Sequence, residues 1–268
     1  MIVRTDAVVL KSMRFRDTSK IVTFYTRKFG KLAAVAKGAR EPKSKFGAAL
    51  EPMTEVHLVL YKKDQRDLQL VSQCDILRPF KTIHSEMPKM EAAMSVLELL
   101  HQLTHDEEEN PALYRLVTDT LEAVEQAEKN VYNFVYAFEL RFSALFGFSP
   151  SFDRCASCGR PAAENNPRIA FRIDRGGLLC SACAEARPMQ RGTGRRLSGA
   201  ATIKLSTAQI LHRLLTARLD SLSSLGYHES VGNELDETLR SYLRYHFEQL
   251  RPLKSAGVFR MMSPGGHR

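Results

Sequence analysis

The sequence predicts an α+β protein in which an N-terminal five-stranded β-barrel is followed by an α-helical domain with an inserted four-cysteine module. Short runs of β-branched and aliphatic residues, bounded by charged residues, Gly or Pro, fill the first eighty positions. From residue 83 onward the apolar residues recur with the period of a helix, and two Cys-x-x-Cys pairs interrupt that pattern. With 268 residues, of which 44% are hydrophobic, the chain is long enough for two or three domains with buried cores.

The strand-like runs predict a small closed barrel over residues 1–80. Five strands in this length suit the OB-fold, which often holds single-stranded nucleic acid in a groove of cations and aromatic side chains. An aromatic residue in a strand more often belongs to the core, so contact with bases is one of two alternatives. The expected strands are residues 6–11, 20–26, 31–36, 55–61 and 68–76. The aromatic candidates are Phe15, Phe24, Tyr25, Phe29 and Phe46.

The helical pattern predicts a second, α-helical domain. Its clearest stripe begins at Val131 and continues through Phe134, Phe138 and Phe142, at helical spacing. The expected helices are residues 86–104, 111–128, 131–146, 207–222 and 234–250. The predicted boundaries are 1–80 for the OB domain, 81–150 and 190–255 for the helical domain, 151–189 for the four-cysteine module and 256–268 for a flexible tail.

The chain carries no sequence signal for a membrane or for secretion. No run approaches the roughly 18 apolar residues of a membrane span, and residues 1–11 lack the apolar core of a signal peptide. We therefore expect a cytoplasmic protein.

Positive charge is concentrated in one short segment near the N-terminus. Residues 11–45 hold eleven Lys or Arg against two acids, a net charge of +9 that equals the excess of the whole chain. Residues 1–80 carry +8, residues 81–150 carry −7 and residues 151–268 carry +8. Such a cluster is typical of a surface that holds a phosphate backbone, and the alternative is a basic, solvated face without a dedicated ligand.

The basic segment contains a loop, residues 37–47, that is too rich in Gly, Pro and charge to form regular structure. Gly38 and Gly47 allow tight turns, and Pro42 limits the freedom of the chain between them. We expect this loop to present its four cations, Lys37, Arg40, Lys43 and Lys45, on one side. Four further candidates for nucleic-acid binding rest on charge alone: Arg14, Arg16, Lys20 and Lys31.

Four cysteines in two pairs predict a structural zinc site. Cys155 and Cys158 form the first Cys-x-x-Cys pair, and Cys180 and Cys183 form the second after 21 intervening residues. Two such pairs complete a tetrahedron of sulfur ligands around one Zn²⁺. Two disulfides do not suit a cytoplasmic protein, a redox-active pair needs only one motif, and a catalytic zinc usually keeps an open position. Cys74 reads as a small buried hydrophobe.

No catalytic motif accompanies these features. The chain has no phosphate-binding GxxxxGK[ST] loop, no GxGxxG, no HExxH and no GxSxG. The histidines are scattered, and the acidic run 106–109 reads as a solvated connector. A zinc-dependent nucleic-acid enzyme would need an open metal site and a general base, which four thiolates do not leave. We therefore expect no enzymatic activity.

The order of these features and several short strings resemble the bacterial recombination mediator family RecO. The strings are residues 6–10 (DAVVL), 36–40 (AKGAR), 43–52 (KSKFGAALEP), 138–142 (FELRF), 176–180 (GGLLC) and 252–255 (PLKS). The similarity extends from Thr5 to about Phe259.

This resemblance implies a DNA-binding protein of recombinational repair with no enzymatic activity. It implies binding of single- and double-stranded DNA, annealing of complementary strands and help in loading RecA onto DNA coated by single-strand DNA-binding protein, with RecR as partner. By matching motif, Lys37 and Arg40 come first for DNA contact, followed by Lys43 and Lys45. It also implies a site on the helical domain for the tail of single-strand binding protein, a zinc ion that supports the fold and a nucleoid-associated location.

Without the family resemblance, the residues are equally consistent with a second class of protein. An OB-like barrel with a zinc module would serve equally in an RNA-binding or ribosome-associated protein, because the 2′-hydroxyl that distinguishes RNA leaves no mark in a sequence. Competition between DNA and RNA oligonucleotides of one sequence would separate the two classes.

Overall fold

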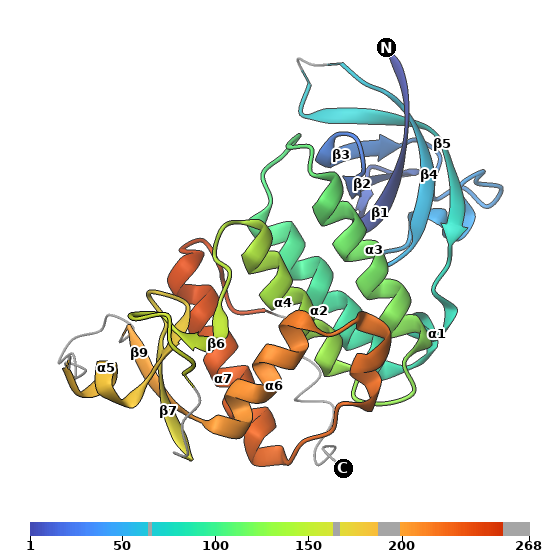
Figure 1. Cartoon of the computed structure of the whole chain (residues 1–268). Coiled ribbons are helices and arrows are strands. Elements are labelled where there is room, and N and C mark those ends of the chain that lie inside the picture. Colours follow the sequence, from blue (N-terminus) through green and yellow to red (C-terminus); the bar gives the residue numbers. More distant parts are fainter. Residues whose placement is uncertain (64–65, 163–166, 187–198, 254–268) are drawn as a thin grey trace. The chain divides into compact units, whose positions relative to one another are not determined.

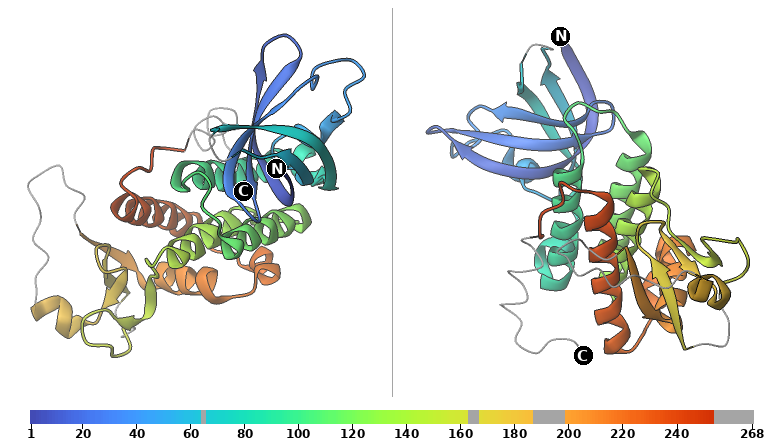
Figure 2. Two further views of the ribbon diagram at one scale, coloured as in Figure 1. Left: turned by 90° about the horizontal axis from the view of Figure 1, so that it is seen from above. Right: turned by 90° about the vertical axis from the view of Figure 1, so that its left-hand side faces the viewer.

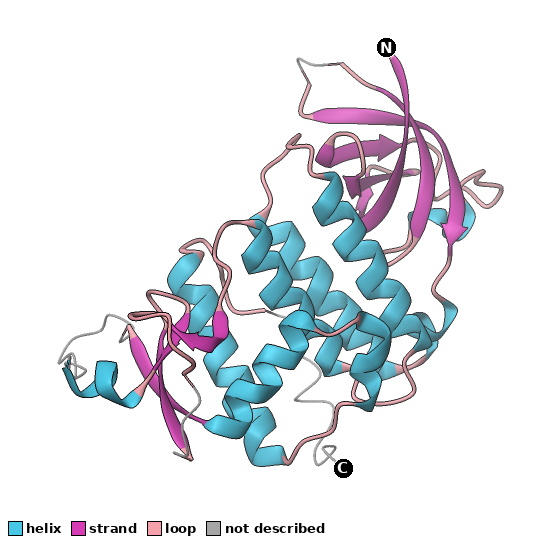
Figure 3. Cartoon of the chain, viewed as in Figure 1, coloured by secondary structure: helices cyan, strands magenta, loops and turns pink. Residues whose placement is uncertain are grey.

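The chain forms two compact units, residues Met1–Gln126 and residues Ala127–Arg251. The computed structural model describes residues 1–63, 66–162, 167–186 and 199–253 (Figure 1). Strands fall into two groups, one formed by β1–β5 and one by β6–β9, and helices make up most of the remainder (Figure 3). The predicted α+β fold class is confirmed.

A closed five-stranded barrel occupies the first part of the chain. Its strands follow the order β1-β2-β3-β5-β4, and β4 pairs again with β1 to close the ring. All neighbours are antiparallel except β3 and β5, which pair in parallel from Ala33 opposite Leu68. This is the OB topology that the sequence predicts, and two further views show the strands curving around a common centre (Figure 2). The bounds are β1 Ile2–Phe15, β2 Ser19–Thr26, β3 Gly30–Ala36, β4 Glu55–Tyr61 and β5 Leu68–Arg78.

Alternating burial along the strands, most regular in β3, fills the barrel. Along β3, Leu32, Ala34 and Ala36 are buried, whereas the residues between them are half-buried on the outer face. Because successive side chains of a strand point to opposite faces, this alternation sets one face of each strand toward a single core. Phe46, just before the 3₁₀ turn Gly47–Leu50, also enters that core and anchors the loop that follows β3.

Three helices follow the barrel within the first unit: α1 Lys81–Ser85, α2 Met87–Leu103 and α3 Pro111–Gln126. Arg78 at the end of β5 forms ion pairs with Glu55 of β4 and Glu122 of α3. Glu125 of α3 accepts the backbone N–H groups of Thr82 and Ile83, both at 2.9 Å. These bonds tie α1 and α3 together and join α3 to the barrel.

The acidic connector between α2 and α3 is exposed, as predicted for residues 106–109, and it also contacts the barrel. Glu107 donates its backbone N–H to the carbonyl of Lys31 (2.8 Å) and pairs with Lys62 (3.0 Å). A Cβ added to Gly30 would lie 2.0 Å from the carbonyl oxygen of Glu108. The sequence could not show that Lys31 and Lys62 lie opposite these exposed acids, because that depends on tertiary packing.

The second unit contains three longer helices: α4 Tyr132–Leu145, α6 Leu205–Thr216 and α7 Glu229–His246, with a 3₁₀ segment at Leu219–Ser224. Asn133 of α4 holds that 3₁₀ segment by donating to the carbonyls of Leu222 (2.9 Å) and Leu225 (2.8 Å). The predicted helix 207–222 therefore ends earlier, at Thr216. The predicted helix 234–250 is shifted and runs from Glu229 to His246.

A small four-stranded sheet in the second unit is absent from the sequence-based prediction. It has the order β6-β8-β7-β9 and is followed after β8 by the short helix α5, Ser181–Ala186. Its strands are β6 Ser151–Cys155, β7 Arg168–Arg172, β8 Gly177–Leu179 and β9 Ala200–Lys204.

The predicted domains separate the barrel from the helices, whereas the division into two compact units falls after residue 126, among the helices. The predicted domain boundaries therefore stay a prediction. The predicted flexible tail, 256–268, lies outside the described residues. Within the described part of the chain, no helix has both the length and the apolar character needed to cross a bilayer.

Candidate nucleic-acid interface and metal centre

The ends of three strands bring several of the predicted cations together. Arg14 of β1 lies opposite Lys20 of β2, and Lys20 lies opposite Ala36, the last residue of β3. Arg16, in the tight β1–β2 turn, adopts a positive φ of 52°. Because antiparallel pairing fixes these positions, the β1–β2 turn and the start of the 37–47 loop lie at the same end of the barrel.

Arg40 fastens the 37–47 loop to this turn. Its backbone N–H donates to the carbonyl of Thr18 (2.8 Å), and its Nη1 donates to the carbonyls of Arg16 (3.2 Å) and Asp17 (2.9 Å). Gly38 has a φ of 70°, the left-handed region that favours glycine. The loop is thus a folded element, and Arg40 has both a structural bond and an exposed charge.

Six of the eight predicted cations are exposed at this end of the barrel or on its loop: Arg14, Arg16, Lys37, Arg40, Lys43 and Lys45. Lys45 Nζ donates to the carbonyl of Ser72 (2.6 Å), which places it over β5. Lys20 is half-buried and pairs with Glu51 (2.9 Å). These cations therefore form one surface, which we call the cation surface.

Lys31 differs from the other seven. Its side chain is only 12% exposed, and its Nζ donates to the carbonyls of His101 (3.1 Å) and Thr104 (2.6 Å) and pairs with Asp106 (3.3 Å). The structure uses Lys31 to hold α2 and the acidic connector on the barrel. A phosphate would have to displace three bonds to reach it.

The aromatic residues of the basic segment are mostly not available for stacking. Phe24, Tyr25 and Phe46 are all less than 5% exposed. Phe15 and Phe29 are half-buried, and Phe15 carries the guanidinium of Arg16 over its ring at 5.1 Å. Of the two alternatives for these aromatics, the core is the correct one for Phe24 and Phe46.

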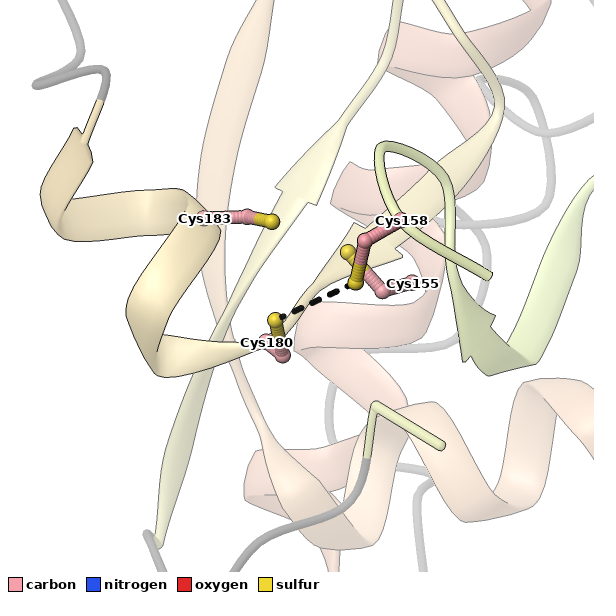
Figure 4. A group of neighbouring side chains, drawn as sticks. All are labelled: Cys155, Cys158, Cys180 and Cys183. Carbon is pink, nitrogen blue, oxygen red and sulfur yellow. Dashed lines mark hydrogen bonds between the residues drawn. The ribbon is translucent and has the colours of Figure 1, made fainter. Parts of the chain in front are cut away.

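The four cysteines converge on one point. Cys155 ends β6, Cys158 lies in the turn after it, Cys180 follows β8 and Cys183 lies in α5. All four Sγ atoms lie within 4.8 Å of one another, and those of Cys158 and Cys180 are 3.7 Å apart (Figure 4). Within the described part of the chain this is the one cluster of His, Cys, Asp or Glu with metal-ligand geometry. The cluster could hold a metal ion, and four soft thiolates suit zinc.

Local backbone bonds shape the first half of this cluster. Ala156 donates its N–H to the carbonyl of Leu178 in β8 (2.7 Å), and Ser157 donates to Cys155 Sγ (3.4 Å). Gly159 turns the chain with a φ of 74°. The turn after β6 therefore reaches the end of β8, and this brings the first cysteine pair to the second.

The crowding of four sulfur atoms favours a bound cation. A hydrogen bond from Arg160 Nε to Cys158 Sγ (3.5 Å) lowers the pKa of Cys158 to about 6. Hydrogen bonds to the sulfurs of Cys180 and Cys158 raise the pKa of Cys183 to about 12. Four thiolates this close cannot all ionise unless a positive charge lies between them. Sequence reasoning missed Arg160, although its place two residues after the first pair was the available signal.

Comparison with known proteins decides the family. The family model described as Recombination protein O N terminal matches residues 1–80, and the model described as Recombination protein O C terminal matches residues 84–256. The chain belongs to the RecO family. Its resemblance to that family, inferred from short strings, is confirmed.

Curated relatives in the RecO family match this chain over nearly its full length. The DNA repair protein RecO of Chloroherpeton thalassium is 31% identical over 268 residues, covering 98% of this chain and 99% of the relative. That of Salinibacter ruber is 33% identical over 257 residues, with 96% and 93% covered. That of Caldanaerobacter subterraneus subsp. tengcongensis is 29% identical over 245 residues, with 91% and 93% covered. The chain is thus a member of a family of DNA repair proteins.

Proposed function

We propose that this chain is a non-enzymatic DNA-binding protein of recombinational repair. It binds single- and double-stranded DNA, anneals complementary strands and assists the loading of RecA onto single strands coated by single-strand binding protein. The observation that carries the proposal is the cation surface, in which the β1–β2 turn and the 37–47 loop meet at one end of an OB barrel. Membership of the RecO family supports the same conclusion.

Contacts to the phosphate backbone explain how one surface can serve both forms of DNA. Lysine and arginine contacts to phosphates are independent of sequence and leave base edges free to pair. A surface with several cations also lowers the repulsion between two polyanions, which annealing requires. In this proposal the main phosphate contacts come from Lys37 and Arg40, and the further contacts come from Lys43, Lys45, Arg14, Arg16 and Lys20. Lys31 has no part in DNA binding, because it packs α2 against the barrel.

The partners in this proposal are RecR and the C-terminal tail of single-strand binding protein, with a functional link to RecA. Support for these partners comes from the family, and the helical domain is the proposed site for the tail. The proposed location is the cytoplasm, in association with the nucleoid. The metal of the four-cysteine cluster is proposed to be one structural Zn²⁺, bound by Cys155, Cys158, Cys180 and Cys183.

The salt dependence of DNA binding tests the cation surface. We expect Lys37→Ala with Arg40→Ala to weaken single-strand binding and to flatten the slope of log K against log salt by roughly one to two units, since about that many phosphate contacts are lost. A second pair, Lys37→Ala with Lys43→Ala, avoids the structural bonds of Arg40. Fluorescence anisotropy at several salt concentrations measures both.

The matched control removes two charges from the opposite end of the same strands. Arg27 and Lys28 are exposed in the β2–β3 turn, about 20 Å along β2 from Lys20. Arg27→Ala with Lys28→Ala should leave the slope nearly unchanged. An equal loss in both pairs would mean that bulk charge, and not the cation surface, binds DNA. Failure of the wild type to anneal strands coated by single-strand binding protein would contradict the mediator function.

A further inference from the structure

The four residues of the cysteine cluster are unequally exposed. Cys155 and Cys180 are only 3% and 2% exposed, and Cys183 is half-buried. Cys158 is the exposed member of the cluster and lies in the turn after β6. A reagent in solution therefore meets Cys158 before it meets the other three.

The surroundings of Cys158 favour reaction with an oxidant. The exposed side chain of Arg160 donates a hydrogen bond from its Nε to Cys158 Sγ (3.5 Å). Positive charge beside a partly exposed sulfur is typical of reactive cysteines, whereas cysteines buried in apolar cores are inert. A metal bound in the cluster keeps its cysteines as thiolates, the nucleophilic form. Cys74 is the opposite case, because it is buried in the barrel core.

A second sulfur atom lies within reach of Cys158. The Sγ atoms of Cys158 and Cys180 are 3.7 Å apart (dashed line in Figure 4). Because a disulfide bond is about 2.05 Å long, these two atoms need to approach by less than about 2 Å to form one. Cys180 is itself too buried to meet an oxidant directly. The pair therefore has an exposed cysteine that can be oxidised and a protected cysteine that can react with the product.

The short helix α5 depends on the cluster for its attachment. None of its residues, Ser181–Ala186, is buried, so it has no apolar anchor of its own. Cys180 immediately precedes α5 and Cys183 lies within it. A helix of six residues is too short to be stable by itself in water. Loss of the metal should therefore release α5.

We propose that Cys158 is the site at which hydroperoxides oxidise this protein, and that a disulfide between Cys158 and Cys180 then releases the metal and α5. The proposal rests on the zinc ion proposed above and goes beyond it, because it assigns a chemical modification to one of the four ligands. The disulfide removes two of the four sulfur ligands, and a structural zinc site needs all four. Reduction by a thiol would restore the site.

The reaction has two steps. In the first, the Cys158 thiolate attacks one oxygen of hydrogen peroxide, so an S–O bond forms, the O–O bond breaks and the departing hydroxide takes a proton to become water. In the second, the Cys180 thiolate attacks the sulfur of the sulfenic acid, so the S–S bond forms, the S–O bond breaks and a second hydroxide takes a proton. The two thiolates lose two electrons, and these reduce one peroxide to two waters.

The test exposes the full-length protein, loaded with zinc, to hydrogen peroxide. Dimedone labels sulfenic acids, non-reducing digestion with mass spectrometry maps disulfides, and a chromogenic chelator measures released zinc. We expect the label on Cys158, a disulfide between Cys158 and Cys180, and release of about one zinc ion per disulfide. Hydrogen exchange in α5 should increase at the same time. Cys74 is the internal reference and should stay unlabelled.

Two matched variants separate Cys158 from the rest of the cluster. Cys158→His and Cys183→His each keep four ligands, because three cysteines and one histidine also bind zinc. Cys158→His should keep its zinc at peroxide concentrations that empty the wild type, whereas Cys183→His should lose its zinc at least as readily as the wild type. If either variant does not take up zinc, the labelling and the disulfide map of the wild type decide.

Three results would overturn the proposal. These are equal zinc loss from the two variants, a first label on a cysteine other than Cys158, and a disulfide that does not join Cys158 to Cys180. A wild type that takes up no zinc would contradict the proposed metal instead, and the order of labelling would still decide the site of oxidation.

Discussion

At the scale of single residues, two lysines only six positions apart have different roles. Lys31 and Lys37 lie in the same basic segment. Lys31 donates hydrogen bonds to two backbone carbonyls and pairs with an aspartate, whereas Lys37 is exposed. The sequence could identify both as cations of a basic segment. It could not separate them, because the partners of Lys31 are some seventy residues away and depend on tertiary packing.

Glu139 of α4 is a buried carboxyl group of the second unit. Burial raises its pKa to about 8, and Asp236 on α7 adds to the rise while Arg240 opposes it. The folded protein therefore keeps this proton up to about pH 8, whereas the unfolded chain loses it near pH 4.3. Because the folded state binds more protons in this window, stability falls as pH rises through it.

We predict that Glu139→Gln stabilises the protein above about pH 5 and that the gain grows up to about pH 8. The gain is on the order of 1.4 kcal/mol for each unit by which the pKa is raised. Urea unfolding at several pH values measures it. Glu237→Gln, an exposed change on α7, is the control and should not alter the pH dependence. Parallel curves for wild type and Glu139→Gln would contradict the prediction.

At the scale of elements, sequence patterns predicted the strands of the barrel well and the small sheet not at all. Each barrel strand has an alternating or continuous apolar run bounded by turn residues, and the prediction for β4 matches its bounds. The strands β6–β9 are only three to five residues long. Runs this short have no period to detect, so only the tertiary pairing reveals them.

Gly30 lies where the backbone of the acidic connector contacts the barrel most closely. Its φ of 61° and the 2.0 Å approach of an added Cβ to the Glu108 carbonyl both require glycine. We predict that Gly30→Ala costs about 1 kcal/mol for the backbone conformation and a further ~1–3 kcal/mol for overpacking. Thermal or urea unfolding measures the loss.

Gly47→Ala is the matched control, because Gly47 has a similar φ of 49° but no atom within 4 Å of an added Cβ. It should show the backbone cost alone. Equal losses in the two variants would mean that the connector moves aside easily and does not pack tightly on the barrel.

At the scale of the whole molecule, the two compact units depend on different interactions. The first unit closes its own barrel around an apolar core. In the second unit, the four-cysteine cluster joins the turn after β6 to the end of β8 and to α5. A metal there would act on the second unit only, because each ligand belongs to it.

We predict that Cys155→Ser lowers the metal content well below one ion per chain and increases hydrogen exchange in β6, β8 and α5. Exchange in the barrel should not change. Elemental analysis and exchange with mass spectrometry measure the two effects, and Cys74→Ala, a change in the barrel, should keep the full metal content. A wild type that is folded and free of metal would contradict the prediction.

The closure of the barrel also has a consequence during synthesis. Strands β1, β2 and β3 pair as successive hairpins. The outer edges of β1 and β3 pair only with β4 and β5, which come later in the chain, as in Ile2 opposite Tyr61 and Ala33 opposite Leu68. At about 5–20 residues per second, the ribosome takes a few seconds to add the remaining strands. Throughout that interval the apolar inner face of the first three strands has nothing opposite it. We expect the dense positive charge around it to keep nascent chains apart by mutual repulsion, so that the barrel can close before it aggregates.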